Sequence, residues 1–486
     1  MTGDGAIQQY TMRKAARTIS GVTPVAVMSR PAVCPGQCVY CPTFATTPQS
    51  YTPESPAVLR AINCDYNGGR QVSLRLKILA EMGHPTDKVE LIVMGGTFLA
   101  CAVDYQYRFI KACYDALNGN ISNSLEEAKR RNEASVHRCV GLCIETRPDW
   151  CRQEEIDRML DFGATRVELG VQTLDDDIYR LVRRGHSVAD VASATRRLKE
   201  HGFKVHYHWM PGLPGSTPQK DLTLSEKLFG DDSFKPDGLK LYPTMVVAGT
   251  ELEKWYLAGR YQPYGRRTMT DLMVDIKTIV PGYVRISRVL RDIPAKFITA
   301  GLKDSLRDTL KGRMEQRGID CRCIRCREYG HRQRQGISPA GEPQLRRIDY
   351  QASGGREIFL SFEDEIGTLY GSLRLRLQEE YPSRLGTSGP AALVRELHIY
   401  GPEVSLGRRL DDAAQHRGLG RALLEEAERI AVAESGALTI AVLSGTGARG
   451  YYRAVSGYRL KAGYMVKKLV QKRPKTSMIM KASAGK

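Results

Sequence analysis

The stretch Cys34-Pro-Gly-Gln-Cys38-Val-Tyr-Cys41 decides the fold, because it places three cysteines at the spacing C-x3-C-x2-C. Three thiolates this close together can cap three irons of a 4Fe–4S cluster and leave the fourth iron without a protein ligand. An open iron can bind S-adenosylmethionine, whose reductive cleavage releases a 5′-deoxyadenosyl radical. Tyr40, just before the last cysteine, can pack against the bound cofactor. The alternative for these cysteines is a zinc site with a distant fourth ligand.

Beyond this stretch, apolar runs alternate with amphipathic helical stretches. Strands are expected at 89–94, 139–144, 165–170, 204–210 and 238–241, with helices between them at 104–117, 154–162 and 190–201. This alternation predicts βαβ units and a parallel sheet, so the fold class is α/β. Five or more units in series favour a full or partial barrel, whose functional groups lie at the carboxyl ends of the strands.

Polar motifs follow several of these expected strands. Gly95-Gly96-Thr97 ends the first and could offer backbone carbonyls to the amino group of the cofactor. Glu145 and Gln172 end later strands and could bind its ribose or carboxylate, and His208 also falls at a strand end. Each motif alone has an ordinary explanation as a turn, a cap or an ion pair, but together they predict one cofactor site at this end of the barrel.

A second group of cysteines, Cys321, Cys323 and Cys326, has the spacing C-x-C-x2-C. Zinc in tetrahedral geometry is the expected occupant, and His331 is the nearest candidate for a fourth ligand. Chance clustering of core cysteines is the alternative, although Arg-rich surroundings make a poor core. We interpret the segment 301–344 as a linker or small module stapled by this metal.

A different motif, Gln415-His416-Arg417-Gly418-Leu419-Gly420, lies between a strand expected at 393–399 and a helix expected at 421–433. Its glycines allow backbone N–H groups and the helix N-terminus to approach a pyrophosphate. It resembles the acyl-CoA loop of the Gcn5-related acetyltransferases, in which a tyrosine at the place of Tyr452 commonly protonates the leaving thiolate. The stretch 445–450 also matches the dinucleotide pattern G-x-G-x-x-G, but no acidic residue follows at the right distance, so we reject that interpretation.

Composition places these motifs in a basic, globular chain of two or three domains. The 486 residues are 42% hydrophobic and 26% charged, which excludes wholesale disorder. The 72 Lys and Arg exceed the 54 Asp and Glu, and the net charge of +18 makes a nucleic acid the first candidate partner. No apolar run is long enough to span a membrane and no secretory signal is visible, so we expect a cytoplasmic protein without a membrane partner.

The combination of a cluster-bearing barrel and a C-terminal acetyltransferase domain resembles the catalytic subunit of Elongator in its stand-alone prokaryotic form. Strings over nearly the whole chain carry the resemblance, at 87–98, 145–149, 166–172, 236–244, 395–401 and 463–467. The tight C-x3-C spacing departs from eukaryotic relatives, which have extra residues there, but the number of ligands is the same. The family's reaction is carboxymethylation of the wobble uridine of tRNA at C5, using acetyl-CoA and S-adenosylmethionine.

The resemblance also implies site residues. The cluster ligands are Cys34, Cys38 and Cys41, and Lys240 joins the strand-end residues as a cofactor contact. Acetyl-CoA contacts are expected at Lys88, Glu396, Leu397, His398, Ile399, Gln415, Gly418, Leu419, Gly420, Arg421 and Tyr452, with Tyr452, Glu396 and His398 as candidate catalytic residues. The alternative function is a protein lysine acetyltransferase in which Glu396 or His398 deprotonates an amine, but it leaves the radical-type cluster without a task.

The domain division expected from these features has five segments. They are a basic N-terminal arm (1–20), a radical SAM barrel (21–300), a Cys/Arg-rich zinc linker (301–350), an acetyltransferase-like domain (351–470) and a basic tail (471–486). We expect tRNA to lie across the domain boundary, bound through phosphate contacts by Arg13, Lys14 and Arg17 of the arm and by Arg322, Arg325 and Arg327 of the linker. A second copy of the chain and other Elongator subunits are further candidate partners.

Overall fold

The barrel is a seven-stranded parallel sheet whose strands lie side by side in the order in which they occur in the chain. The computed structural model describes residues 18–401 and 418–469. The sheet order is β1 (Thr23–Met28), β2 (Lys88–Met94), β3 (Arg138–Thr146), β4 (Arg166–Gln172), β5 (Lys204–Trp209), β6 (Gly238–Leu241) and β8 (Arg285–Val289). Because these strands are all parallel and follow chain order, they form a partial (β/α) barrel, which confirms the expected fold class.

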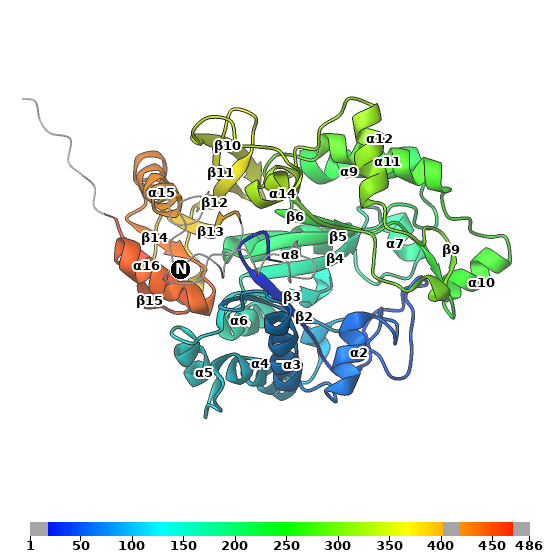
Figure 1. Cartoon of the computed structure of the whole chain (residues 1–486), viewed down its shortest axis with the longest axis horizontal. Coiled ribbons are helices and arrows are strands. Elements are labelled where there is room, and N and C mark those ends of the chain that lie inside the picture. The colour runs from blue at the N-terminus through cyan, green and yellow to red at the C-terminus, as the bar shows by residue number, and fades with distance from the viewer. Residues whose placement is uncertain (1–17, 402–417, 470–486) are drawn as a thin grey trace, which may run out of the picture.

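Helices connect the strands and cover the outer face of this sheet (Figure 1). They are α2 (Pro56–Asn63), α3 (Gly68–Glu81), α4 (Val103–Asn118), α5 (Leu125–Asn132), α6 (Gln153–Phe162), α7 (Asp176–Leu181), α8 (Val188–Glu200), α9 (Pro218–Gly230), α10 (Glu251–Leu257) and α11 (Arg266–Ile279). Strand β2 shows why the sheet has two different faces: Val89, Leu91 and Val93 are buried in the core with the helices, whereas Glu90 and Ile92 face the lumen of the barrel. Among the helices of the described ranges, none has the length and apolar character needed to cross a membrane.

The segment after the barrel packs on it as a layer of short helices. Helices α12 (Arg307–Gln316), α13 (Ile324–Arg327) and α14 (Tyr329–Arg334) form this layer. Arg313 of α12 and Arg317, directly after it, form ion pairs of 2.8 Å with Asp271 and Asp275 of α11. The backbone N–H of Ile324 donates to Val284 O at 2.9 Å, just before β8. The linker is therefore held to the barrel at several points.

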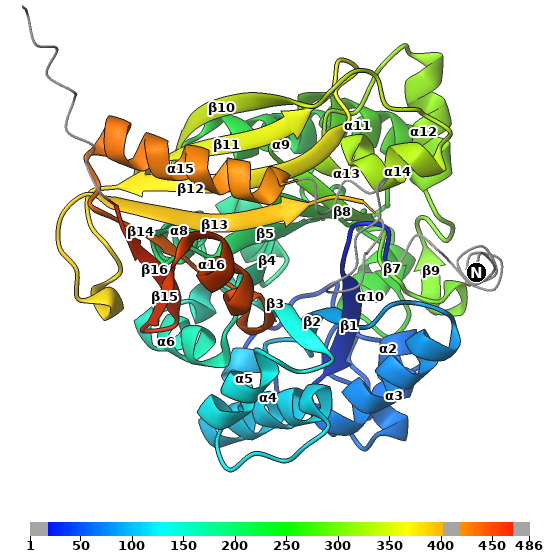
Figure 2. The ribbon, with the colours of Figure 1, turned by 60° about the vertical axis from the view of Figure 1, so that its left-hand side comes forward.

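The C-terminal domain is a second seven-stranded sheet, mostly antiparallel, which lies across the barrel (Figure 2). Its order is β10 (Gln344–Ala352), β11 (Gly355–Glu363), β12 (Leu369–Gln378), β13 (Ala391–Ile399), β14 (Thr439–Val442), β16 (Tyr464–Lys468) and β15 (Arg459–Lys461), with α15 (Leu419–Ser435) and α16 (Arg449–Ser456) as its helices. Strand β13 pairs with the parallel strand β14 only over Ala392–Val394. Beyond these residues β13 continues without β14, which opens a gap between the two strands.

A buried ionic network joins the two sheets. Asp237, just before β6, binds the guanidinium of Arg395 through both carboxylate oxygens at 2.7 Å. Arg395 sits at a register shift between β12 and β13, and it also contacts Glu357 of β11 at 2.7 Å. The ring of Tyr283 stacks on Tyr350 at 4.0 Å. Because these side chains come from both sheets, the network fixes the domains against each other.

Two of the three glycines of the rejected dinucleotide pattern serve close packing between the domains. The turn Thr446–Ala448 lies on strand β3 of the barrel. A Cβ atom at Gly445 would lie 2.0 Å from Val140 O, and one at Gly447 would lie 2.5 Å from the Cβ of Arg138. Any larger residue at these two positions would push the sheets apart, which explains the glycines without a nucleotide.

Candidate functional site

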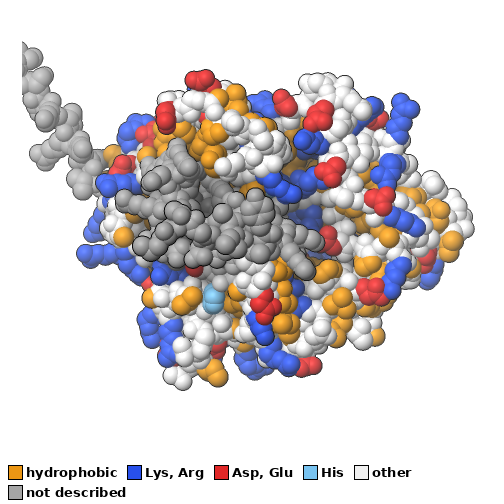
Figure 3. Space-filling view, viewed as in Figure 1, with side chains coloured by type: hydrophobic (Ala, Val, Ile, Leu, Met, Phe, Trp, Pro, Cys, Tyr) orange, Lys and Arg blue, Asp and Glu red, His pale blue; other side chains and the backbone are white. Residues whose placement is uncertain are grey.

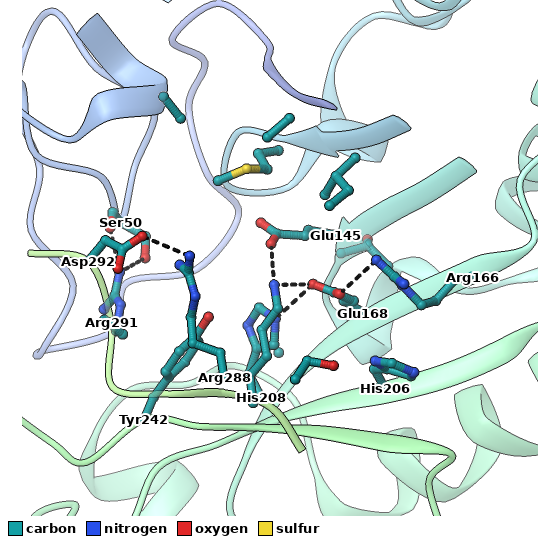
Figure 4. A pocket seen from close by; sticks show the side chains of 18 of the residues that line it. Ser50, Glu145, Arg166, Glu168, His206, His208, Tyr242, Arg288, Arg291 and Asp292 are labelled. Atoms are coloured by element: carbon teal, nitrogen blue, oxygen red, sulfur yellow. Dashed lines mark hydrogen bonds and ion pairs between the residues drawn. The ribbon is translucent and has the colours of Figure 1, made fainter. Parts of the chain in front are cut away.

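The barrel lumen and the carboxyl ends of its strands enclose a cavity of about 790 Å³, which we call the barrel cavity. Figure 4 shows side chains from several strands converging on it. The expected residues that line it are Cys34, Cys38, Tyr40, Cys41, Gly96, Thr97, Glu145, Gln172, His208 and Lys240. The folded chain therefore brings together the cysteine stretch and the strand-end residues, although they are up to two hundred positions apart.

The three cysteines of the first stretch lie in a loop between β1 and α2. Cys38 is buried, and the Sγ of Cys34 lies 3.7 Å from Thr97 Oγ1. Among the described residues, two sets of three metal-binding side chains have their ligand atoms within 4.8 Å of one another, and this loop is not one of them. Its sulfurs are therefore spread more widely than a single ion requires. Three cysteines with this spread, next to a large cavity, fit a 4Fe–4S cluster with one open iron.

The glycine motif after β2 forms the turn that the cofactor interpretation needs. Gly95 and Gly96 have φ values of +134° and +73°, and a Cβ at Gly95 would lie 2.1 Å from Ser29 Oγ. Gly96 and Thr97 line the barrel cavity, whereas Gly95 packs behind them. Gln172, also with a positive φ of 75°, has a buried Oε1 without a hydrogen-bond partner, so this oxygen is available to a ligand.

Lys240 forms ion pairs with two carboxylates that line the barrel cavity. Its Nζ lies 3.0 Å from Glu145 Oε1 and also contacts Glu168, whose Oε2 is 3.4 Å from His208 Nε2. Burial disfavours the ammonium, but the two carboxylates outweigh this effect and raise the pKa of Lys240. Tyr51 donates to Glu145 Oε2 at 2.6 Å. Glu145 and Lys240 thus form an ion pair with each other, so we assign them to the wall of a cofactor site.

A second cavity, of about 490 Å³, lies in the gap between β13 and β14, and we call it the acyl cavity. The expected acetyl-CoA residues that line it are Lys88, Glu396, Leu397, His398, Ile399, Gly418, Leu419, Gly420, Arg421 and Tyr452. Gln415 lies outside the described residues. Gly418 has a φ of +80° and immediately precedes helix α15, so the helix N-terminus faces this cavity.

The candidate catalytic residues of the acyl cavity differ in their protonation. Burial raises the pKa of Tyr452, so its phenol keeps its proton. Burial also acts to raise the pKa of Glu396, but Lys204 at 3.0 Å and Arg374 at 2.7 Å hold it well below its usual value. Since Ser20 O can only accept, His398 Nε2 at 2.7 Å from it carries a hydrogen. Glu396 is therefore a paired, weakly basic carboxylate, which disfavours the amine-deprotonating role.

The two cavities meet inside the molecule. Five residues line both of them: Val22, Glu90, Lys204, Glu396 and His398. They come from the residue just before β1, from β2 and β5, and from β13 of the second sheet. The acyl cavity therefore adjoins the barrel at the amino ends of its strands, opposite the end that carries the cysteine loop.

The second cysteine group forms one of the two compact sets. The sulfurs of Cys321, Cys323 and Cys326 lie within 4.8 Å of one another, and Lys277 Nζ is 3.9 Å from Cys326 Sγ. His331, the expected fourth ligand, points instead to Glu328, with Nε2 2.9 Å from its Oε1. The side chain beside the thiols is therefore the ammonium group of Lys277, and not His331 as predicted.

Sequence reasoning missed several residues that line the barrel cavity. Arg166, Glu168, Lys204 and His206 point into the lumen from β4 and β5. The sequence carries a signal for them, because every second position of 166–172 and 204–208 is polar, apart from Gly170. Arg147 and Arg184, which reach the cysteine loop, carry no comparable periodic signal.

Comparisons with known proteins agree with this architecture. The Radical SAM superfamily matches residues 28–225, and the Radical_SAM C-terminal domain matches residues 236–316. A tRNA uridine(34) acetyltransferase of Dehalococcoides mccartyi (strain CBDB1) is 66% identical over 94% of this chain and 100% of its own length. Elongator complex protein 3 of Homo sapiens is 43% identical over 94% of this chain and 86% of its own.

A solved structure gives the same result. An archaeal Methanocaldococcus infernus Elp3 with an N-terminal deletion superimposes with a TM-score of 0.81 at 44% identity, over 93% of this chain and 100% of the other. Each of these relatives is matched over nearly its full length, so the similarity includes both sheets. The chain therefore belongs to the family of the tRNA uridine(34) acetyltransferases and Elongator complex protein 3.

Proposed function

We propose that this protein forms 5-carboxymethyluridine at the wobble position of tRNA, with acetyl-CoA as donor and S-adenosylmethionine as radical source. One observation carries the proposal: a cavity built around three cluster-type cysteines adjoins a cavity built around an acyl-CoA loop, and the two share five wall residues. A lysine acetyltransferase would need only the second cavity. The names of the most similar relatives, tRNA uridine(34) acetyltransferases, support the same substrate.

The residues of the chain have separate tasks in this function. Cys34, Cys38 and Cys41 would hold the cluster, which together with S-adenosylmethionine supplies a radical able to take a hydrogen atom from the acetyl methyl group. Gly96 and Gln172, which line the barrel cavity, would offer polar groups to the bound cofactor. The N-terminus of α15, which lines the acyl cavity, would hold the pyrophosphate of the acyl donor.

Tyr452 is proposed to donate its proton to the leaving thiolate. We expect Tyr452→Phe to slow carboxymethylation by about 100-fold, the lower end of the range for loss of a general acid, while iron content and cleavage of S-adenosylmethionine are unchanged. Release of free coenzyme A, measured with a thiol reagent, would be slowed by the same factor. Tyr458→Phe is the matched control, because the Tyr458 hydroxyl donates to Glu428 and does not line the acyl cavity.

The substrate RNA is proposed to enter the barrel cavity beside the linker layer. On the face drawn in Figure 3, the visible basic side chains are interspersed with acidic ones, so charge alone does not single out a patch there. Arg325 lines the barrel cavity, and burial together with Arg307 and Arg285 lowers its pKa to about 10, so it remains charged at neutral pH. A charged guanidinium held close to other cations suits a phosphate.

The side chain of Arg327 is excluded from this proposal, although the linker sequence had suggested it. It is 12% exposed and binds Glu363 at 2.8 Å and Gly282 O at 2.6 Å. These contacts hold the linker to the barrel and to the second sheet. The proposed linker contacts to RNA are therefore Arg322, which is exposed, and Arg325.

We expect Arg325→Ala to weaken tRNA binding and to reduce the slope of log affinity against log salt by roughly 0.7–0.9, the value for one phosphate contact. Binding titrations at several salt concentrations would measure this slope. Arg108→Ala on α4, an exposed arginine on another side of the barrel, is the control and should leave affinity and slope unchanged. Equal slopes for Arg325→Ala and the unmodified protein would place the RNA elsewhere.

The compact cysteine set in the linker is proposed to hold a structural zinc ion through Cys321, Cys323 and Cys326. Cys323 is fully buried and precedes α13, whose first residue is hydrogen-bonded to the barrel. We expect metal analysis of anaerobically purified protein to find about one zinc per chain in addition to iron. Cys323→Ser should remove the zinc and lower the melting temperature, with the iron retained. Protein that contains iron but no zinc would contradict the assignment.

The test of the function is incubation of tRNA with the protein, acetyl-CoA, S-adenosylmethionine and a reductant without oxygen. Digestion and mass spectrometry should find 5-carboxymethyluridine at the wobble position, and product should require both cofactors. Product formed from acetyl-CoA without S-adenosylmethionine would overturn the radical mechanism. Acetylation of a protein substrate without any tRNA product would favour the alternative.

A further inference from the structure

Two buried arginines flank the cysteine loop. Arg184, which is 7% exposed, donates from Nη1 to the Sγ of Cys38 at 3.3 Å and from Nη2 to Gly170 O. Its backbone is held in place, because its N–H donates to Tyr179 O at 2.8 Å. The same turn also binds the cysteine loop directly, since Val39 N donates to Val182 O at 3.1 Å. The position of the guanidinium against the sulfur is therefore fixed by backbone contacts on both sides.

Arg147 approaches the loop from the end of β3. Its Nε and Nη2 bind Asp149 at 2.9 and 3.0 Å, and Nη2 also donates to Arg184 O at 2.9 Å. The remaining nitrogen, Nη1, is buried and has no hydrogen-bond partner. It lies against Gly36, where a Cβ would come within 2.0 Å of it. An unused charged donor thus faces the middle of the loop between Cys34 and Cys38.

The charge of Arg184 is not balanced by a protein carboxylate among the described residues. Asp149 pairs with Arg147, but within the described part of the chain no carboxylate lies within ion-pair distance of Arg184. A buried guanidinium without an anion is costly, because desolvation of a charge needs an opposite charge to offset it. The acceptors beside Arg184 are a carbonyl oxygen and the sulfur of Cys38, so the missing anion is the thiolate and the cluster attached to it.

We propose that Arg184, supported by Arg147, sets the reduction potential of the cluster held by Cys34, Cys38 and Cys41. This inference rests on the proposed function, because it presupposes the cluster. Reduction adds a negative charge, and a cation that donates a hydrogen bond to a ligand sulfur stabilises the reduced form more than the oxidised form. The arginine pair therefore raises the potential and makes the cluster easier to reduce. In this proposal Arg184 acts on the cluster through the sulfur of Cys38 and not on the substrate.

The test is a redox titration of the full-length protein with reconstituted cluster, followed by electron paramagnetic resonance. At the midpoint of the unmodified protein we expect Arg184→Gln to have at least tenfold less reduced than oxidised cluster, which is a shift of about −59 mV or more for one electron. Arg184→Lys, which keeps the charge, should shift less. Arg183→Gln is the matched control, because this neighbouring arginine is exposed and loses the same charge.

A second measurement distinguishes a changed reduction potential from a damaged cluster. Cleavage of S-adenosylmethionine by Arg184→Gln should be slow with dithionite and should recover with the stronger reductant titanium(III) citrate. An unchanged midpoint in Arg184→Gln with full iron content would overturn the inference. Should that variant fail to assemble its cluster, the titration of Arg147→Gln, which removes the other buried charge beside the loop, decides in the same way, and an unchanged midpoint overturns the inference. An unmodified protein that holds no cluster would instead overturn the proposed function.

Discussion

Cys38→Ser and Cys41→Ser should each abolish anaerobic cleavage of S-adenosylmethionine, with a loss of at least about 1,000-fold, or roughly 4 kcal/mol in transition-state stabilisation. The reason is that the loop has three thiolates and no spare ligand, so each substitution leaves one more iron without a protein ligand. Formation of 5′-deoxyadenosine, measured by chromatography, reports the effect without tRNA. Binding of acetyl-CoA should be unchanged, because these cysteines do not line the acyl cavity.

Cys101→Ser provides the control for a lost thiol, since Cys101 lies outside both cysteine groups. It should retain the cluster spectrum and the full rate of cleavage. A protein with Cys34, Cys38 and Cys41 all replaced that still carboxymethylated tRNA would refute the radical mechanism.

Asp237→Asn should destabilise the whole chain by about 3–5 kcal/mol, the range for breaking a buried ion pair by removal of one partner. The substitution leaves Arg395 buried with one carboxylate fewer, and Arg374 loses an acidic neighbour at 3.4 Å. Thermal and denaturant unfolding would measure the change. Asp304→Asn is the control, since its pair with Arg266 is exposed, and it should leave stability unchanged.

The same carboxylate gives the protein a pH dependence. Burial alone would raise the pKa of Asp237, but Arg395, Arg374 and Lys199 hold it well below its usual range. A depressed pKa in the folded state contributes stability above the unfolded pKa of about 3.9, and this contribution is lost as the pH falls below that value. Asp237→Asn should therefore lose less stability than the unmodified protein between about pH 5 and pH 3.

The alternation of apolar runs and helices was enough to predict most of the barrel. The strands at 89–94 and 238–241 appear as β2 (Lys88–Met94) and β6 (Gly238–Leu241), because their outward side chains are aliphatic and buried. Strand β8 (Arg285–Val289) was not predicted, since its two arginines and its serine hide an apolar pattern of only two residues. The first strand, β1 (Thr23–Met28), was missed because it precedes the cysteine loop without a helix between them.

The site was predictable where a motif carries its own chemistry and not where it depends on contacts across the chain. The cysteine spacing and the acyl-CoA loop place residues within a few positions of one another, so sequence alone indicates a shared ligand. Arg184 reaches Cys38 over 146 positions, and Lys240 reaches Glu145 over 95. Nothing in the local sequence marks such pairs, because the pairing depends on which strand ends the barrel brings together.

The wall shared by the barrel cavity and the acyl cavity restricts how this protein can be rebuilt by recombination. Exchange of the C-terminal sheet for an unrelated acetyltransferase would remove Glu396 and His398 from the barrel cavity as well as from the acyl cavity. Exchange of the barrel would likewise take Val22, Glu90 and Lys204 from the acyl cavity. Neither half is an interchangeable module, and a chimaera of this enzyme would have to be joined outside both sheets, in the arm or in the tail.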